Sequence, residues 1–512
     1  PSPVLPGPLP MSPARRRWLP LLWVASAASA GEESPGSCST GGGPCGSTGD
    51  VPAYHWPMQK GSIGRTGFSK HPVPDLTKGS SWNWFDPFHD VARASPLIDD
   101  ERSVYVTTVA GRIYKFNDVG VIVWERRLDA GIPTGGALYN GSLFLGTRDG
   151  RVLSIDMKSG EDRWNASVSV IGLTAADPAT IFAHDGTVVT ATHSDADDKR
   201  GNSDVVAIRA EDGSFLWRFQ PEQTTFHLQV CSPGDGTIIF QDKAGGVYRL
   251  GLADGRLLWK SSKVGVKAGE GQTTGATVCH EGKVYAVNNP PDQNDGLLRV
   301  YSVEDGRQLW QTYLPYLAHQ AVAIGPHPTE KGKLMAVLGI GESPGMPAVL
   351  PVTEQLGYYA GLLFHQLDLS FPWLFGNHLA ALAAYDLEHG KRLWLLEMDP
   401  FQRAAAAGES ERIRKRYADI MLGANPNNDF VCLPGAWSQP VIGPDGTVYI
   451  GSQDGRLYAV RDADGNGQIH REREVSSYDF GEGFQAPPAL APGMLVAMPC
   501  GGGLRVFQTA GR

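Results

Sequence analysis

Two stretches of this 512-residue chain gather the oxygen-bearing side chains that bind hard cations. Residues 193–204 read His-Ser-Asp-Ala-Asp-Asp-Lys-Arg-Gly-Asn-Ser-Asp, and residues 288–296 read Asn-Asn-Pro-Pro-Asp-Gln-Asn-Asp-Gly. Calcium takes six to eight oxygen ligands from carboxylates, amides and carbonyls, so each stretch could contribute to a Ca²⁺ site. Solvated acidic loops have the same composition, and this second interpretation stays open.

A third stretch, Asp462-Ala-Asp-Gly-Asn-Gly-Gln-Ile, matches the first half of a Ca²⁺-binding loop. The glutamate that such a loop has at its twelfth position is replaced by Arg473. Asp, Asn and Gly are also the residues that tight turns use, so we interpret this stretch as a plain turn.

Other chemistry has no motif in the sequence. It contains no G-x-S-x-G elbow, no phosphate-binding P-loop and no H-E-x-x-H zinc motif. The 45 basic and 54 acidic residues give a net charge of −9, and no basic stripe interleaved with aromatic residues stands out. Nucleic acid is therefore excluded as the main partner.

A repeated pair of residues indicates the elements that position these stretches. A glycine precedes a tryptophan by four positions six times, each time after an alternating apolar segment. A tight hairpin needs a residue at φ > 0, which glycine adopts freely, and the tryptophan can cover the neighbouring sheet. The pairs are Gly120 and Trp124, Gly160 and Trp164, Gly213 and Trp217, Gly255 and Trp259, Gly306 and Trp310, and Gly390 and Trp394.

Each repeat is predicted to form four short antiparallel strands. The tryptophans are 40, 53, 42, 51 and 84 residues apart, and a period of 40–45 residues with loop insertions is typical of a β-propeller. We therefore predict an all-β fold, a single eight-bladed β-propeller, with seven blades as the alternative. The seventh repeat has Arg471 where tryptophan is expected. The eighth lacks a fourth strand, and residues 77–86 are predicted to supply it and close the ring.

Four long insertions are predicted to lie on one face. With the strands of a blade called A to D from the channel outward, the B–C and D–A loops share a face. Three B–C insertions (193–204, 288–296 and 341–378) and one D–A insertion (399–437) therefore fall together. Loops on a rigid scaffold are where function is usually found.

The unit Gly-Arg-Leu-Tyr-Ala-Val at 455–460, with an acidic turn and Gly-x-x-x-Trp, resembles the repeat of pyrrolo-quinoline quinone (PQQ)-type propellers. Trp-Pro-Met-Gln at 56–59 and Arg-Thr-Gly-Phe-Ser at 65–69 resemble the segment that often precedes them. The resemblance covers roughly residues 56–509. This superfamily holds quinoprotein alcohol dehydrogenases and also binding proteins such as the outer-membrane assembly lipoprotein.

The resemblance to the dehydrogenases implies a cofactor site of PQQ and calcium over the channel. Asp195 or Asp197 would then be the acidic metal ligand, Asn289 the amide metal ligand and Asp295 the catalytic base. The chain lacks the adjacent Cys-Cys pair of many of these enzymes. We expect a binding or scaffold module that holds a protein or an apolar ligand at the loop face, with an alcohol- or sugar-oxidising dehydrogenase as the alternative.

The first 55 residues are expected to lie outside the propeller. Residues 1–30 combine an upstream stretch with a secretory signal that starts at Met11, and 31–55 form a Gly/Ser/Pro-rich linker. An extracellular or periplasmic location follows, without a membrane span in the mature chain. The six cysteines fit such a compartment. Cys231 and Cys279 occupy matching places in adjacent repeats, and Cys432 and Cys500 fall in loops of one face, so disulfides are possible.

Overall fold

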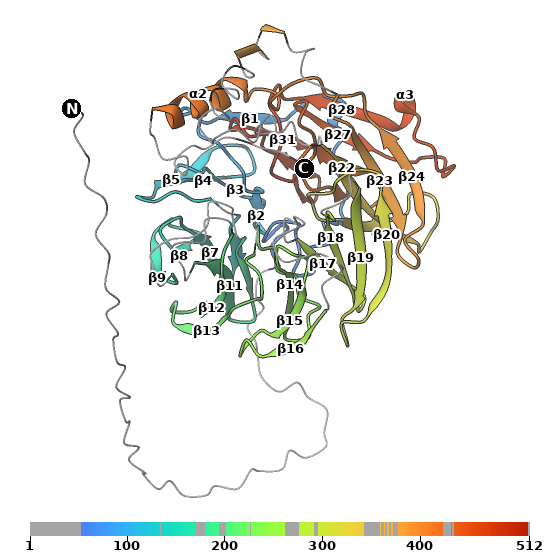
Figure 1. Cartoon of the computed structure of the whole chain (residues 1–512). Helices are drawn as coiled ribbons and strands as arrows, with labels where there is room; N and C mark the ends of the chain where they lie inside the picture. The colour runs from blue at the N-terminus through green and yellow to red at the C-terminus, as the bar shows by residue number, and fades with distance from the viewer. Residues whose placement is uncertain are drawn as a thin grey trace, which may run out of the picture. The chain divides into compact units, whose positions relative to one another are not determined.

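The structure, a computed structural model, describes residues 53–509 with gaps. The gaps are 134, 170–179, 194–200, 226, 262–275, 291–294, 343–358, most positions from 360 to 376, 423–431 and 433–434. The described residues form eight antiparallel sheets that follow one another around a ring in chain order (Figure 1). Apart from two helices and one 3₁₀ turn, the regular elements among them are strands, so the predicted eight-bladed all-β propeller is confirmed.

Each blade runs from an inner strand at the channel to an exposed outer strand. The inner strands are β2 (Leu97–Ile98), β6 (Ala137–Tyr139), β10 (Phe182–His184), β17 (Thr277–His280), β21 (Ala323–Pro326), β25 (Val441–Ile442) and β29 (Ala489–Ala491). In blade 4 this place is taken by Cys231, which forms an antiparallel bridge to Ile239. The second strands are β3 (Val104–Thr107), β7 (Ser142–Gly146), β11 (Thr187–Thr192), β14 (Thr237–Gln241), β18 (Lys283–Asn288), β22 (Leu334–Gly341), β26 (Val448–Gly451) and β30 (Met494–Ala497).

The third strands are buried and the fourth strands form the rim. The third strands are β4 (Arg112–Phe116), β8 (Arg151–Asp156), β12 (Asp204–Arg209), β15 (Val247–Gly251), β19 (Gly296–Ser302), β23 (Ala380–Asp386), β27 (Arg456–Val460) and β31 (Gly503–Gln508). The fourth strands are β5 (Ile122–Arg127), β9 (Asp162–Ser167), β13 (Phe215–Phe219), β16 (Leu257–Lys260), β20 (Gln308–Leu314), β24 (Arg392–Glu397), β28 (Val475–Asp479) and β1 (Trp82–Phe85). The remaining elements are η1 (Leu76–Lys78), α2 (Ser410–Met421) and α3 (Arg471–Glu474).

The ring is closed by the N-terminal strand, as the sequence predicts. Strand β1 pairs antiparallel with β31, with Trp82 opposite Val506 and Phe85 opposite Gly503. Blade 8 therefore takes three strands from one end of the described chain and one from the other. This pairing leaves the last blade with the same four strands as its neighbours.

Neighbouring blades are joined by a contact between the tryptophan of one blade and the glycine of the next. A Cβ atom on Gly160 would lie 2.8 Å from the Trp124 ring, which is too close for any side chain. The Trp124 indole also donates a hydrogen bond to the Met157 carbonyl at 3.1 Å. The same two contacts recur for Trp82 on Gly120, Trp164 on Gly213, Trp217 on Gly255, Trp259 on Gly306 and Trp310 on Gly390. The glycine is thus required for space as well as for its positive φ.

Blade 7 is the exception to this contact. Arg471, which stands where the repeat predicts tryptophan, begins the short helix α3, and the fourth strand β28 follows it. The Trp394 ring of blade 6 is buried, but its indole Nε1 has no hydrogen-bond partner among the described residues. The junction between blades 6 and 7 therefore lacks the indole hydrogen bond that the other tryptophans make.

Residues 54–76 lie along the inner strands and contact each of the eight blades at its inner strand or at a residue close to it. Backbone hydrogen bonds or bridges join Trp56 to Ile98, Pro57 to Leu138, Ile63 to Ser232, Gly64 to Cys279, Thr66 to Ile324, Gly67 to Ile442 and Pro72 to Gly493. The side chain of Arg65 reaches blade 3, where it donates to the Ile181 carbonyl at 3.2 Å. We call this segment the plug. It lies at the ends of the inner strands that lead into the A–B turns.

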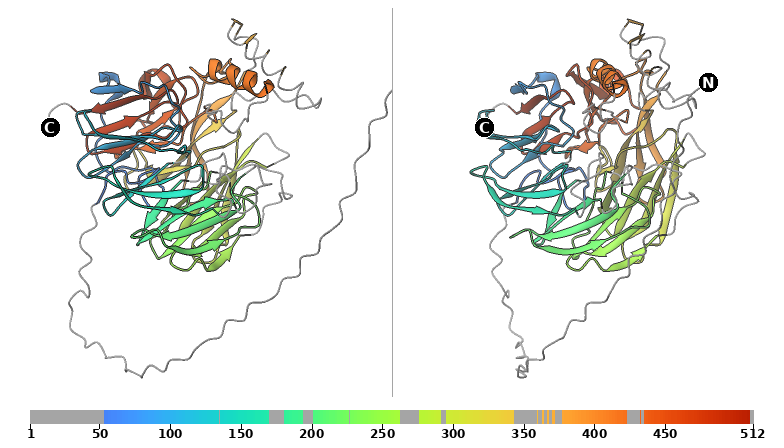
Figure 2. Two further views of the ribbon diagram at one scale, coloured as in Figure 1. Left: turned by 90° about the vertical axis from the view of Figure 1, so that its left-hand side faces the viewer. Right: turned by 60° about the vertical axis from the view of Figure 1, so that its left-hand side comes forward.

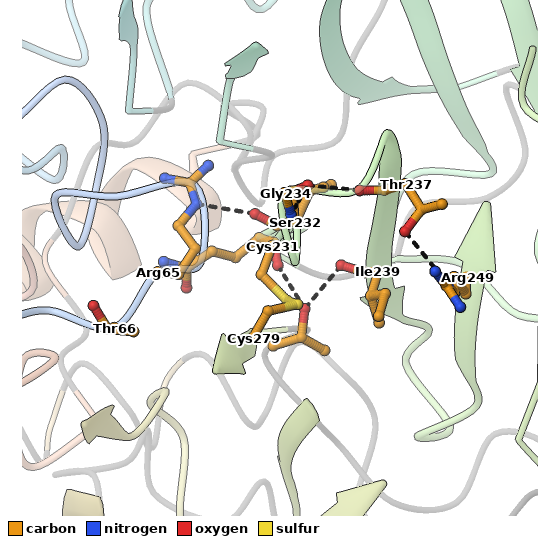
Figure 3. Close-up of a disulfide and its surroundings, with 12 residues drawn as sticks. Arg65, Thr66, Cys231, Ser232, Gly234, Thr237, Ile239, Arg249 and Cys279 are labelled. Atoms are coloured by element: carbon orange, nitrogen blue, oxygen red, sulfur yellow. Dashed lines mark hydrogen bonds between the residues drawn. A yellow bond between two sulfur atoms is a disulfide. The ribbon is translucent and has the colours of Figure 1, made fainter. Parts of the chain in front are cut away.

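The plug holds two buried cations that no sequence pattern indicates. Lys60 donates to the carbonyls of Val322 and Pro440 at 2.9 and 2.8 Å. Arg65 donates to Gln59 and Val230 at 2.7 and 2.9 Å as well as to Ile181. Both side chains are fully buried, and burial lowers the pKa of each. Figure 3 shows Arg65 beside the disulfide of Cys231 and Cys279, which links blades 4 and 5 with their Cα atoms 5.7 Å apart.

Substitution of Gly160 should distinguish two reasons for glycine, the lack of space for a Cβ atom and the positive φ of the backbone. Gly160→Ala and Gly186→Ala both place alanine at positive φ, but only Gly160 faces a ring, since nothing lies within 4 Å of a Cβ on Gly186. Gly160→Ala should therefore lower the free energy of unfolding by about 1–3 kcal/mol more than Gly186→Ala. Urea unfolding followed by tryptophan fluorescence measures both, and equal losses would contradict a spatial role.

Removal of the Arg65 guanidinium should destabilise the whole ring. Arg65→Met leaves three buried carbonyls on blades 3 and 4 and the plug without their donors, at a cost of about 2–4 kcal/mol after the buried charge is relieved. Thermal unfolding measures the loss. Arg256→Met, at a side chain that is 75% exposed, is the control and should change stability by less than about 0.5 kcal/mol. Similar melting temperatures for the two variants would refute a structural role for Arg65.

Candidate functional site at the mouth of the channel

The long insertions share one face of the ring, as the strand order predicts. Residues 193–203 join β11 to β12, 289–295 join β18 to β19, and 342–379 join β22 to β23, all of them B–C connections. Residues 398–440 connect blade 6 to blade 7 and contain α2. Figure 2 shows α2 and the described turns of the blade 6 insertion projecting from the same side of the ring. We call this side the loop face.

The channel is closed just below the loop face by a pair of amides. The Gln229 and Gln439 side chains donate to each other, at 3.2 and 3.0 Å. Gln229 precedes Cys231 of blade 4 and Gln439 precedes β25 of blade 7, and these blades are not neighbours, so the two side chains meet across the channel. Both are buried. The plug and this amide pair therefore both lie inside the ring, with the pair at the ends of the inner strands nearer the loop face.

Two histidines and an asparagine come from three further connections of the loop face. The Asn289 carboxamide accepts a hydrogen bond from the Ala318 amide at 2.8 Å, and its nitrogen lies 3.5 Å from Nδ1 of His319. An electrostatic interaction with His227 contributes to the lowered pKa of His319. Gly435, in the blade 6–7 connection, touches the His319 side chain so closely that a Cβ there would lie 2.8 Å away. We call Gln229, Gln439, His227, His319 and Asn289 the polar layer.

His319 is the member of the polar layer with a shifted pKa. Burial lowers the pKa from the ordinary value of 6.5, and the His227 charge lowers it further. The neutral imidazole is therefore favoured in the folded chain, which suits a hydrogen bond with the Asn289 amide.

The lowered pKa of His319 predicts a loss of stability in acid. Below about pH 6.5 the unfolded chain binds a proton at this position that the folded chain takes up only at lower pH. The free energy of unfolding should therefore fall by about 1 kcal/mol more between pH 7.5 and pH 5 in the parent chain than in His319→Gln. Urea unfolding at the two pH values measures this difference, with His389→Gln, at a side chain that is 81% exposed, as the control. Parallel pH dependence in the parent chain and His319→Gln would contradict it.

The structure places two of the four residues suggested by the dehydrogenase resemblance. Asn289 is buried in the polar layer, whereas Asp295 is exposed immediately before β19. Both belong to the same B–C connection of blade 5. Asp195 and Asp197 lie outside the described residues, so their role as metal ligands stays a prediction.

A PQQ and calcium site stays a prediction, because Asp195 and Asp197 lie outside the described residues. Asn289 uses its carboxamide oxygen for the Ala318 amide. Across the described ranges, one group of three acidic, histidine or cysteine ligands lies close enough to share an ion, and it is elsewhere, at Asp462, Asp464 and Glu474. These residues therefore support no reaction step through PQQ, and the assignment of Asp295 as a base stays a prediction.

Sequence reasoning missed most of the polar layer. Gln229 and Gln439 each stand two positions before the inner-strand residue of their blade, Cys231 and Val441. A polar residue at this place in an otherwise apolar segment was the available signal. That the two amides meet, 210 positions apart, is a property of the closed ring.

The insertion between blades 6 and 7 is anchored to the ring. Helix α2 of this insertion spans Ser410–Met421. Arg412 of this helix forms an ion pair with the buried carboxylate of Glu409. The Cys432 amide donates a hydrogen bond to the same carboxylate at 3.0 Å. These two contacts hold the segment together. Cys432 also forms a disulfide with Cys500. The two disulfides in the described residues thus join the cysteines of matching places in adjacent repeats, Cys231 and Cys279, and the two cysteines expected in loops of one face, Cys432 and Cys500.

Apolar side chains are exposed on the two largest insertions. Leu363 is 59% exposed and Leu422, at the end of α2, is 86% exposed. Tyr359, Phe371 and Leu379 are exposed as well. Among the described residues no helix is long and apolar enough to cross a membrane. Both insertions therefore expose apolar side chains, as do outer strands of the ring at residues such as Ile122 and Phe215.

Eight blades of antiparallel strands define the class of fold, an eight-bladed β-propeller, and its repeats are similar to those of PQQ-type propellers. The profile of the outer membrane protein assembly factor BamB matches residues 89–218 and 174–333. BamB of Nitrosomonas eutropha is 27% identical over 224 residues, which are 41% of this chain and 49% of that protein. The chain thus aligns with about half the length of this relative.

Solved structures of both binding and catalytic proteins share the fold. The crystal structure of BamB from Moraxella catarrhalis superposes with a TM-score of 0.55 at 13% identity, over 84% of this chain and 99% of that one. Quinohemoprotein alcohol dehydrogenase from Comamonas testosteroni superposes with a TM-score of 0.58 at 13% identity, over 89% and 81%. At these identities the likeness shows the fold alone.

Proposed function

We propose that this chain is a binding or scaffold propeller that holds a partner protein at its loop face. The exposed apolar side chains of the two largest insertions, around Leu363 and Leu422, carry the proposal. Exposed apolar groups gathered on one side of a protein are typical of an interaction surface, and aromatic and aliphatic anchors dominate the energy of such contacts.

The closed axis supports the same function. A ring whose channel is filled by the plug and by the Gln229–Gln439 pair is a rigid platform, because every blade is tied to one central segment. Insertions on a rigid platform present a fixed surface, which lowers the ordering cost of binding. The relative named an assembly factor for outer membrane proteins has the same repeat. We extend its binding role, without its partner, to this chain.

A location in the cell envelope or secretory pathway belongs to this proposal. The disulfides of Cys231 with Cys279 and of Cys432 with Cys500 fit an oxidising compartment. The secretory signal predicted within residues 1–30 would deliver the chain there.

Site-specific cross-linking tests the proposed surface. A photoreactive benzoyl-phenylalanine at Leu363 or at Leu422 should yield an adduct with the same protein, identified by mass spectrometry, in cells that express the full chain. The matched control is the same probe at Lys331, which is exposed in the A–B turn of blade 6 on the opposite face. We expect no adduct with that protein from Lys331, since its turn points away from the loop face.

The outcomes separate the scaffold from the dehydrogenase. Adducts from all three positions, or from none, would overturn the proposed binding face. In parallel, the purified chain is incubated with PQQ and Ca²⁺ and assayed for dye-linked alcohol oxidation. Tight PQQ binding with turnover that is lost in Asp295→Ala would favour the quinoprotein dehydrogenase, whose fold the Comamonas enzyme shares.

A further inference from the structure

The connection between the third and fourth strands of blade 7 is longer than a turn needs to be. Residues 461–474 separate β27 from β28 and end in α3. They begin with Asp462, Asp464 and Asn466 at alternate positions, followed by Gly467. This order of oxygen ligands and glycine is that of a Ca²⁺-binding loop, which takes ligands from its first, third and fifth positions and turns at the sixth.

Helix α3 supplies the acid that the sequence pattern lacks. The twelfth position is Arg473, but the thirteenth is Glu474, and α3 brings its carboxylate back over the start of the loop. There Glu474 accepts hydrogen bonds from the Ala463 and His470 amides at 2.7 and 2.8 Å. Single carboxylate oxygens of Asp462, Asp464 and Glu474 all lie within 4.8 Å of one another.

Asp462 gives an independent sign that the loop holds an ion. Its side chain is only 2% exposed, and one oxygen, Oδ2, accepts from the Gly467 amide at 3.0 Å. The other oxygen, Oδ1, is buried and has no hydrogen-bond partner among the described residues. A buried carboxylate oxygen without a donor costs free energy unless something positive binds it, and Asp462 belongs to the cluster of three acids.

We propose that residues 462–474 form a structural Ca²⁺ site. The carboxylates of Asp462, Asp464 and Glu474 would bind the ion, with the Asn466 side-chain oxygen and the Gln468 carbonyl as the further ligands that the loop order offers. Oxygen ligands and an acidic charge suit Ca²⁺ better than a transition metal, because the cluster contains no thiolate. The site lies on the A–B and C–D side of the ring, away from the loop face.

The position of the loop gives the ion a structural task. Gly465 packs on Thr329 of blade 6, and Gly467 packs on the Leu393 carbonyl beside Trp394. Arg471 bonds Asp399 at 3.0 Å and also reaches the Glu397 carbonyl. The loop therefore stands at the one described junction where the tryptophan indole has no acceptor. Bound calcium would hold the loop of residues 462–474 against blade 6, at the junction where the tryptophan–glycine contact is missing.

Calorimetric titration of CaCl₂ into the chelator-stripped full chain tests the site. We expect one ion per chain with a dissociation constant between about 10⁻⁶ and 10⁻³ M, and a higher melting temperature in CaCl₂ than in chelator. Asp464→Asn, at an exposed side chain, should weaken binding at least tenfold without harming the fold. Asp462→Asn should do the same and should also leave the melting temperature indifferent to CaCl₂.

Asp305→Asn is the matched control, because Asp305 occupies the C–D turn of blade 5 and is exposed. It should bind Ca²⁺ like the parent chain. No heat of binding and no change in melting temperature at 5 mM CaCl₂ would overturn the proposal and leave the loop a plain turn. Binding that survives in both Asp462→Asn and Asp464→Asn would place the ion elsewhere and would overturn it as well.

Discussion

The contact of a tryptophan ring with a glycine of the next blade is the interaction on which the rest of the ring depends. At six of the eight junctions the indole occupies the space of a missing side chain, so the residue opposite the ring has to be glycine. The hydrogen bond from the indole to a carbonyl of the next blade then fixes the orientation of the tryptophan ring on the C–D turn of that blade. Repetition of one local contact sets the angle between blades, and that angle determines how many blades complete a circle.

The contacts between blades lie near the rim of the ring, and the centre is occupied by one segment, the plug. The plug donates and accepts backbone hydrogen bonds along the inner strands of the blades, and Lys60 and Arg65 extend these contacts to the carbonyls that backbone alone cannot reach. Unsatisfied polar groups inside a protein are costly, so the two buried cations are explained by the carbonyls around them. The plug thus ties distant blades to one another through the centre of the ring.

The sequence was sufficient for features that repeat locally. The six glycine–tryptophan pairs predicted the blades, and the Trp82 segment predicted the closing strand, because each depends on residues a few positions apart. The plug, the Gln229–Gln439 pair and the role of Lys60 depend on residues that only the closed ring brings together. Glu474 was missed because a helix of one turn moves it to a place that a count of positions assigns to Arg473. At the candidate site, the sequence indicated Asn289 as a metal ligand, which stays a prediction, and it did not indicate His319 or either glutamine.

The closing strand also sets an order of events for a chain under synthesis. The register of Trp82 with Val506 means that the last blade cannot form until nearly all of the chain is available, although β1 is among the first strands made. Until then β1 has no sheet to join, and the plug has no complete set of inner strands to cross. Pairing of segments that are far apart in the sequence is slow. The intervening chain loses conformational entropy before the new contacts stabilise the fold. The propeller therefore stays incompletely folded during synthesis. Incompletely folded chains are the ones that can pass through a narrow pore and fold afterwards.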